Sequence, residues 1–366
     1  MRDNRLNFEQ FQNIVKESIR DHLPEEYRHA EIKISEYQKL NASYTGMQVR
    51  KDDQSIFPNI NLTEMFDYYQ KTGMSMEAVL TSIAQQVQLK PDLETDFIKD
   101  YSMAKDHLFI RVSNAKDNED FLKKMPHREV DGLAITYHIN LGGTDDMAAS
   151  VPVTDQLLAI YGISEEQLHA DAMESTQKVF PAQFVSMEVM MRRMMGVPED
   201  MEMPPMGVPG LMVLTNDQTL NGAGALFYPG QMDQVAQQME GDFFVLPSSI
   251  HEVLILADDG TMDLDSLQFM VREVNRSTVD EKEQLSDFVY HYDAKDHVLE
   301  KAETFAERMF EKEHQAKEET SRSTFEKDGD GRKERSSVLQ KLNDKKEQLK
   351  VQPKKETPGR RQEVVL

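Results

Sequence analysis

The sequence predicts an α+β fold that is followed by a disordered C-terminal tail. Three observations lead to this prediction. Apolar residues recur at helical spacing in some segments and alternate with polar residues in others. The two kinds of segment follow no regular strand–helix–strand order. After about residue 300, apolar residues become too sparse to offset the entropy of ordering the chain.

In the first part of the chain, the periodicity predicts several helices and two pairs of strands. The opening helix is expected over residues 8–23, where Phe8, Phe11 and Val15 share a face and Pro24 ends the run. Alternating segments predict strands over residues 30–37, 42–50, 108–112 and 133–139. Helical spacing predicts helices over residues 62–69, 75–89 and 118–125.

A glycine-containing join at residues 142–146 is predicted to separate an N-terminal lobe (1–145) from a C-terminal lobe (146–300). In the second lobe, helices are expected over residues 154–161, 164–179 and 229–239 and after the capping residue Asp263. Strands are expected over residues 183–191, 211–215, 223–228, 243–246, 252–257 and 288–292.

Residues 301–366 are predicted to form a charged tail that begins with a solvated helix over residues 301–317 and is disordered from residue 318. One short segment, residues 336–342, has apolar residues that a binding partner could order as a small helix. These residues are Val338, Leu339 and Leu342. The simpler interpretation of this segment is coil with marginal helicity.

The composition excludes several classes of site. A chain of 366 residues with no cysteine has no disulfides, thiolate zinc sites, iron–sulfur clusters or cysteine nucleophiles. No apolar run approaches the ~20 residues of a membrane-spanning helix, and the N-terminal residues lack the apolar stretch of a signal peptide. We therefore expect a soluble cytoplasmic protein without membrane association, and nothing in the sequence indicates a cofactor.

Negative charge is concentrated in one region. Of the net charge of −23, residues 131–300 carry −22, from 7 Lys and Arg against 29 Asp and Glu. Such a surface repels phosphate backbones, so direct binding of nucleic acid by the body is disfavoured. Solubility is the simplest reason for this charge. The alternative is that the acidic face imitates nucleic acid and acts as a decoy for a nucleic-acid-binding protein.

The densest group of reactive residue types is Ser248, Ser249, His251 and Glu252. A serine hydrolase needs a nucleophile, a base in contact with it, and an acid that orients the base. In a strand, Ser249 and His251 share one face and Glu252 lies on the other. A Gly-x-Ser-x-Gly turn is also absent. A hydrolase-like enzyme using Ser248 or Ser249 with His251 is therefore only an alternative hypothesis, and we lean against an enzyme.

No metal site is predicted. Glu165 and His169 lie four residues apart on one helical face, but no third ligand accompanies them. Residues 326–331 resemble the start of a calcium loop, but the twelfth position is Ser337, where a glutamate is required.

Methionine is concentrated in the second lobe, where nine of the 23 methionines fall between Met187 and Met212. Methionine suits both irregular cores and adaptable binding surfaces. Core filling is therefore one interpretation, and a partner-binding patch is the other. The residues of such a patch are Met194, Met195, Met201, Met203 and Met206.

Seven segments of the chain carry a resemblance to a known family. They are VPVTDQLL (151–158), GISEEQLH (162–169), VLTN (213–216), GAGALFYP (222–229), FVLPSSIHEV (244–253), MVREVN (270–275) and LSDFVYHYD (285–293). Together they resemble the uncharacterised bacterial family labelled domain of unknown function 5688. The resemblance covers most of residues 5–300, and the methionine-rich insert and Gly224 depart from it.

The resemblance implies a bacterial, cytoplasmic protein, often encoded near conjugative mobile elements, but no activity. If family members share a functional surface, the polar residues inside the apolar motifs are the best candidates. Besides the Ser248–Glu252 group, these are His169, Asn275 and Asp287. Their alternative role is to satisfy strand ends and helix caps. The favoured prediction is a non-enzymatic interaction or accessory protein that binds an unknown protein partner.

Overall fold

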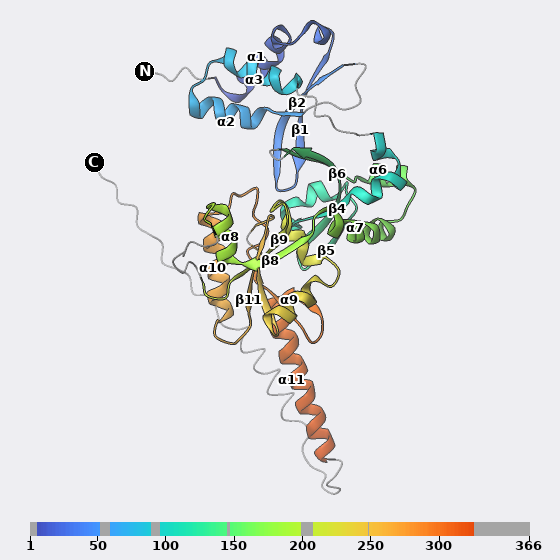
Figure 1. Ribbon diagram of the computed structural model, residues 1–366, viewed down its shortest axis with the longest axis vertical. Helices are drawn as coiled ribbons and strands as arrows, with labels where there is room; N and C mark the ends of the chain where they lie inside the picture. The colour runs from blue at the N-terminus through green and yellow to red at the C-terminus, as the bar shows by residue number, and fades with distance from the viewer. Residues whose placement is uncertain are drawn as a thin grey trace, which may run out of the picture. The chain divides into compact units, whose positions relative to one another are not determined.

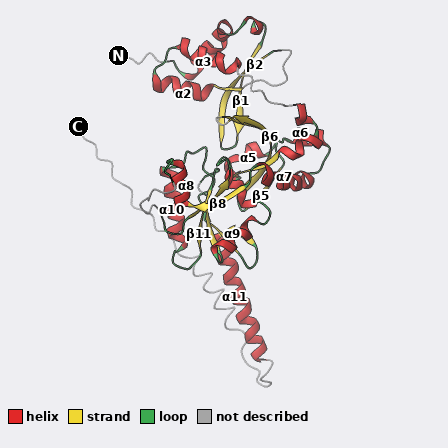
Figure 2. Cartoon of the chain, viewed as in Figure 1, coloured by secondary structure: helices red, strands yellow, loops and turns green. Residues whose placement is uncertain are grey.

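The computed structural model describes residues 6–51, 59–88, 96–144, 147–198, 208–247 and 249–325. Within these ranges the strands form antiparallel sheets of three, four and six strands, and helices pack against them (Figures 1 and 2). The predicted α+β class is confirmed, because no parallel βαβ unit is present among the described elements. Contacts divide the chain into a large unit, Met1–Ala306, and a second unit, Glu307–Leu366.

The three-stranded sheet and three helices enclose a core of their own near the N-terminus. Phe11 and Val15 of the first helix pack with Ile83 in this core, and all three side chains are fully buried. Asn7 caps the first helix, and short 3₁₀ turns follow it at Ile19–His22 and Glu25–Tyr27. The elements are α1 (Phe8–Ser18), β1 (Glu31–Lys39), β2 (Ala42–Arg50), β3 (Asn59–Asn61), α2 (Leu62–Thr72) and α3 (Met76–Gln88).

The four-stranded sheet has the order β4–β6–β5, and β7 pairs with the remaining part of β6. Helix α7 packs along β4, where the Ile110 N–H donates a hydrogen bond of 3.2 Å to Thr176 Oγ1. The elements are η3 (Asp96–Lys99), α4 (Tyr101–Ala104), η4 (Lys105–His107), β4 (Leu108–Asn114), η5 (Lys116–Asn118), α5 (Glu119–Leu122), β5 (His127–Val130), β6 (Leu133–Thr144), β7 (Met147–Pro152), α6 (Asp155–Tyr161) and α7 (Glu165–Val179).

The six-stranded sheet has the order β13–β12–β10–β11–β9–β8. One side chain of its central strand, Val245, joins the core of the four-stranded sheet, whereas Leu246 joins a smaller core with Leu267 and Val271 of α10. The elements are β8 (Ala182–Ser186), α8 (Met187–Met194), β9 (Met212–Asn216), η6 (Gly222–Phe227), α9 (Gln231–Met239), β10 (Phe243–Leu246), β11 (Val253–Ala257), α10 (Leu264–Ser277), β12 (Tyr290–Asp293) and β13 (Val298–Lys301).

Two strand predictions in the second lobe are wrong. The strand predicted over residues 183–191 ends at Ser186, whose side chain caps α8 by accepting a hydrogen bond from the Val189 N–H. The strand predicted over residues 223–228 is instead the 3₁₀ helix η6. Both segments are short apolar runs, for which periodicity does not separate strand from helix.

The predicted lobe boundary at residues 145 and 146 lies between two paired strands. Strands β6 and β7 are antiparallel, and the glycine pair Gly142 and Gly143 sits at an irregularity in their pairing. Ile139 of β6 and Val153 after β7 belong to the same core. The glycines therefore serve a turn within one sheet, and the separate N-terminal core involves residues 8–87.

The helix predicted over residues 301–317 is present and longer, since α11 spans Ala302–Phe325. Ala302 is buried, and the ring of Phe305 stacks on that of His291 with centroids 3.7 Å apart. The rest of the predicted tail, including Val338, Leu339 and Leu342, lies outside the described residues. In the described part of the chain, no helix is long and apolar enough to cross a bilayer.

Candidate functional site

Most of the predicted polar residues meet at one loop, residues 280–287, which joins α10 to β12 (loop 280–287). Ser249 pairs with Gln284 in an isolated antiparallel bridge. On either side of it, the Ile250 N–H donates to the Glu283 carbonyl at 2.8 Å and the Ser286 N–H donates to the Pro247 carbonyl at 3.0 Å. The segment that follows β10 is therefore held along this loop.

Asn275 and Asp287, the other two predicted polar residues of this region, are bonded to each other. The Asn275 amide donates to Asp287 Oδ1 at 2.8 Å and to the Ser286 carbonyl at 3.0 Å. The Gln284 amide donates back to the Asn275 carbonyl at 2.9 Å. These bonds hold the end of α10 against the loop. Satisfying the polar groups at the ends of helices and strands is the alternative role that the sequence analysis gave for these residues.

Two asparagines from the first part of the chain also bind this loop. The Asn41 amide donates to the carbonyls of Lys282 and Gln284, at 3.1 and 3.3 Å. The Asn114 amide donates to the Leu285 carbonyl at 3.3 Å. Loop 280–287 thus joins the turn between β1 and β2, the end of β4 and the end of α10.

The geometry around His251 does not form a Ser–His dyad with Ser249. The Ser249 hydroxyl oxygen accepts a hydrogen bond from the His251 main-chain N–H at 3.0 Å. The ring faces other groups, because Nδ1 accepts from the Asn221 N–H at 3.2 Å and Nε2 lies 3.5 Å from Glu283 Oε1. Ser248 lies outside the described residues.

Burial shifts the pKa values of Glu252 and His169, but the two side chains do not share a site. Burial raises the pKa of the Glu252 carboxyl, against the opposing effects of the nearby His251 and of a hydrogen bond from Ser249. His169 Nδ1 lies 3.0 Å from the hydroxyl of the buried Tyr137, and burial followed by the nearby Arg128 lowers the pKa of its imidazole. No group of three or more potential ligands is close enough to hold a metal ion anywhere in the described ranges.

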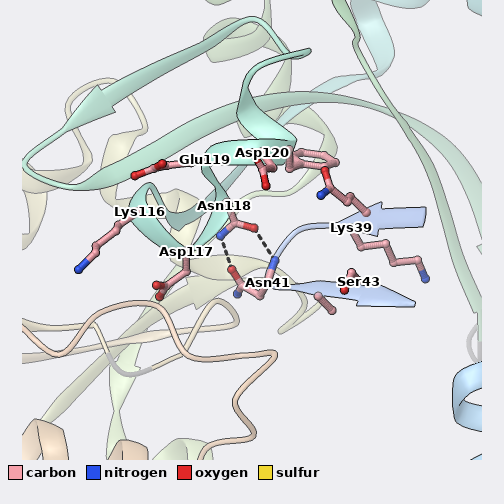
Figure 3. Close-up of a pocket in the computed structure, with 11 residues that line it drawn as sticks. Lys39, Asn41, Ser43, Lys116, Asp117, Asn118, Glu119 and Asp120 are labelled. Atoms are coloured by element: carbon pink, nitrogen blue, oxygen red, sulfur yellow. Dashed lines mark hydrogen bonds between the residues drawn. The ribbon is translucent and has the colours of Figure 1, made fainter. Parts of the chain in front are cut away.

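A polar cavity of about 410 Å³ lies beside this network, between the β1–β2 turn and η5–α5 (Figure 3). Asn41 and Asn118 face each other at its centre (Figure 3). The Asn118 amide donates to Asn41 Oδ1 at 2.6 Å, and the Asn41 N–H donates to Asn118 Oδ1 at 2.5 Å. The lining residues are Gln38, Lys39, Asn41, Ala42, Ser43, Lys116, Asp117, Asn118, Glu119, Asp120 and Phe121.

The cavity is suited to polar contacts rather than to covalent chemistry. Its central amides already satisfy each other, and a hydrogen bond from Lys123 lowers the pKa of the Asp120 carboxyl. Its lining includes both lysines and carboxylates, so charge of both signs is available to a polar ligand or to a protein surface. Among its lining residues, no nucleophile is hydrogen-bonded to a base.

Two of the predicted partner-binding methionines, Met194 and Met195, are described by the structure and lie at the C-terminal end of α8. Met194 has 80% of its surface exposed and Met195 has 51%, whereas Met190 is buried against the sheet. The helix is therefore anchored on one face and presents methionine at its C-terminal end. The other three predicted residues, Met201, Met203 and Met206, lie outside the described residues.

The comparisons with known proteins identify a family but no activity. The model of a family of unknown function, DUF5688, matches residues 8–294 of this chain. The chain belongs to this family. No curated protein and no solved structure matches the chain. The function of this DUF5688 member therefore has to be argued from its own residues.

The asparagines at the centre of the cavity were not predicted from the sequence. Asn41 lies between two alternating segments and has a φ of +61°, a conformation that asparagine adopts more readily than most residues. That position indicates a turn. Asn41 and Asn118 are 77 positions apart, so no local sequence pattern indicates their contact.

Proposed function

We propose that this DUF5688 member is a non-enzymatic interaction protein that binds a protein partner through the exposed methionines of α8. The observation that carries the proposal is the exposure of Met194 and Met195 at the C-terminal end of a helix that is anchored by the buried Met190. Thioether side chains are flexible and polarizable, so they adapt to varied apolar partners. At 80% and 51% exposure, these two side chains contribute little to the core.

The positions of the candidate reactive residues support a binding function over a catalytic one. The Ser249 hydroxyl bonds the main-chain N–H of His251 and the Glu252 carboxyl, and the Asn275 amide donates to the Ser286 carbonyl and to Asp287. Because the Ser249 hydroxyl oxygen, the Asn275 amide nitrogen and Asp287 Oδ1 already have internal partners, a substrate that used these atoms would have to displace structural hydrogen bonds. The hydrolase hypothesis gains no support from these contacts.

We further propose that the partner is met in the bacterial cytoplasm, in association with a conjugative mobile element. The family resemblance of the sequence supports this setting. The absence of cysteine from 366 residues is compatible with a reducing compartment.

The test compares partner capture by variants of the full chain. We expect a specific protein from the lysate of a bacterium that carries this gene to co-purify with the unchanged chain. The double variant Met194→Gln, Met195→Gln should retain at most about a tenth of that partner, since it loses two apolar contacts. Met103→Gln is the matched control, because Met103 is 55% exposed on a different helix.

Two outcomes would contradict the proposal. One is the absence of any specific partner. The other is equal capture by all three chains. If the retained partner were a basic nucleic-acid-binding protein that is released by added salt, the acidic-decoy hypothesis would be favoured instead.

A further inference from the structure

A second cavity, of about 360 Å³, is lined by the end of η6, the start of α9 and the strands β12 and β13, and has walls that are mostly apolar. Its volume lies within the roughly 300–1,000 Å³ that is typical of small-molecule sites. Three polar side chains converge at its edge: Asp233 from α9, Tyr292 from β12 and His297 from the turn before β13. The apolar walls come from Val130, Leu226, Phe227, Met232 and Leu299.

The three polar groups share a single oxygen atom. The Tyr292 hydroxyl donates to Asp233 Oδ1 at 2.5 Å, and His297 Nδ1 lies 2.6 Å from the same atom. These two hydrogen bonds lower the pKa of the Asp233 carboxyl, so it is ionised at neutral pH. An ionised carboxylate only accepts hydrogen bonds, so the imidazole proton lies on Nδ1. The second carboxylate oxygen and, in the neutral imidazole, His297 Nε2 remain as acceptors, without a hydrogen-bond partner among the described residues.

The turn that carries His297 is fixed by its own hydrogen bonds. Asp293 Oδ1 accepts from the N–H groups of Lys295 and Asp296, each at 3.0 Å, and Asp242 Oδ1 accepts from the Ala294 N–H at 2.9 Å. His297 itself has a φ of +57°, in the left-handed region. The imidazole is therefore held at the edge of the cavity by a rigid turn in an uncommon backbone conformation.

We propose that this cavity binds a protonated amine carried on an apolar stem. The second carboxylate oxygen of Asp233 and the absence of lysine and arginine among the lining residues suit an ammonium group. Phe227, Tyr228 and Tyr292 line the cavity, aromatic rings of this kind attract cations, and the apolar walls suit the stem of the amine. The net charge of −22 on residues 131–300 favours a cation over an anion at long range.

The same chemistry occurs in free amines and in lysine side chains, so the experiment uses a probe for each. Calorimetric titration of the full chain compares phenethylamine, its neutral analogue 2-phenylethanol, and N-acetyl-lysine methylamide. We expect phenethylamine to bind at least about tenfold more tightly than 2-phenylethanol, because only the amine gains a charge-assisted hydrogen bond. Tighter binding of the lysine derivative than of phenethylamine would identify a peptide as the source of the amine, and the reverse order would identify a free amine.

Two variants distinguish the effect of the Asp233 carboxylate on amine binding from the effect of the protein's overall negative charge. Asp233→Asn should weaken amine binding at least about tenfold. Asp265→Asn is the matched control, because Asp265 is an exposed residue in the first turn of α10, as Asp233 is in the first turn of α9, and it does not line the cavity. It should change amine binding less than about twofold.

A second readout avoids the question of whether a variant folds. The imidazole proton resonance of His297 in the unchanged chain, assigned with His297→Gln, should shift on addition of phenethylamine and should not shift with 2-phenylethanol. Equal affinity for the amine and the alcohol would overturn the proposal. So would equal binding by the Asp233→Asn and Asp265→Asn chains, an unmoved His297 resonance, or no binding of any probe. Such results would mean that the Asp233–His297 hydrogen bond only holds α9 against the β12–β13 turn.

Discussion

At the scale of single residues, asparagine amides join several segments that are distant in the sequence. Asn118 is 3% exposed and bonds the side chain and the main chain of Asn41. Asn41 in turn bonds two carbonyls of loop 280–287. An amide side chain can donate and accept hydrogen bonds at the same time. One asparagine can therefore bond two segments that are distant in the sequence.

Replacing Asn118 should therefore destabilise the whole large unit. Asn118→Ala leaves the Asn41 N–H without its acceptor, and we expect the free energy of unfolding to fall by about 1–3 kcal/mol. Urea unfolding followed by circular dichroism measures this change. Ser43→Ala is the control, since Ser43 is an exposed residue of the same cavity, and it should stay within about 0.5 kcal/mol of the unchanged chain. Equal unfolding midpoints for all three chains would show that the Asn41–Asn118 pair contributes nothing.

The sequence predicted several of these residues but not what they contact. Asn275 and Asp287 stand out as polar residues within apolar motifs, and the structure joins them over a separation of 12 residues. The sharing of a strand face by Ser249 and His251 suggested a dyad, yet the actual bond runs to the main chain of His251. Spacing limits which side chains can meet, but it does not fix where each hydroxyl or ring points.

At the scale of elements, the long amphipathic helices were predictable and the short apolar segments were not. The helix after Asp263 has its cap and its buried face where the sequence placed them, with Leu267 and Val271 inside. By contrast, η6 is set by a close approach of distant backbone. A Cβ added to Gly222 would lie 2.1 Å from Thr215 Oγ1 and 2.5 Å from the His251 carbonyl oxygen. No local sequence pattern indicates that Thr215 and His251 approach Gly222 so closely.

This crowding gives a prediction for η6. Gly222→Ala should lower the free energy of unfolding by about 1–3 kcal/mol, because the added methyl group forces β9 or the His251 segment to move. Thermal or urea unfolding of the full chain measures the effect.

Gly241→Ala provides the control for that variant. Gly241 has no atom within 4 Å of an added Cβ, and its φ is not positive. Its replacement should leave stability unchanged or slightly raised. If the two alanine variants unfolded alike, the close packing around Gly222 would not be limiting.

At the scale of the whole molecule, negative charge opposes compactness. Residues 131–300 lie within the large unit and carry 29 Asp and Glu against 7 Lys and Arg. Carboxylates at this density repel each other, and the repulsion weakens as salt shortens the screening length. The charge was predictable from composition alone, whereas the position of each sheet relative to the next was not, since it depends on contacts such as that of Asn41 with loop 280–287.

Added salt should therefore stabilise the protein. Raising NaCl from about 20 to about 200 mM shortens the screening length from roughly 20 to 7 Å. We expect the midpoint of thermal unfolding to rise by about 2–4 °C, which corresponds to on the order of 1 kcal/mol. KCl at the same ionic strength should give the same rise. A midpoint that falls or stays constant would mean that the acidic residues are spaced too widely to repel each other.

The bonds between the β1–β2 turn and loop 280–287 also bear on how the chain is made. Asn41 meets its carbonyl acceptors 241 and 243 residues later in the sequence. At roughly 5–20 residues per second, a ribosome exposes that loop on the order of ten to fifty seconds after the turn. During that interval the N-terminal core can form alone, with the Asn41 amide turned to water. Its bonds to loop 280–287 can form only after residues 282–284 have left the ribosome.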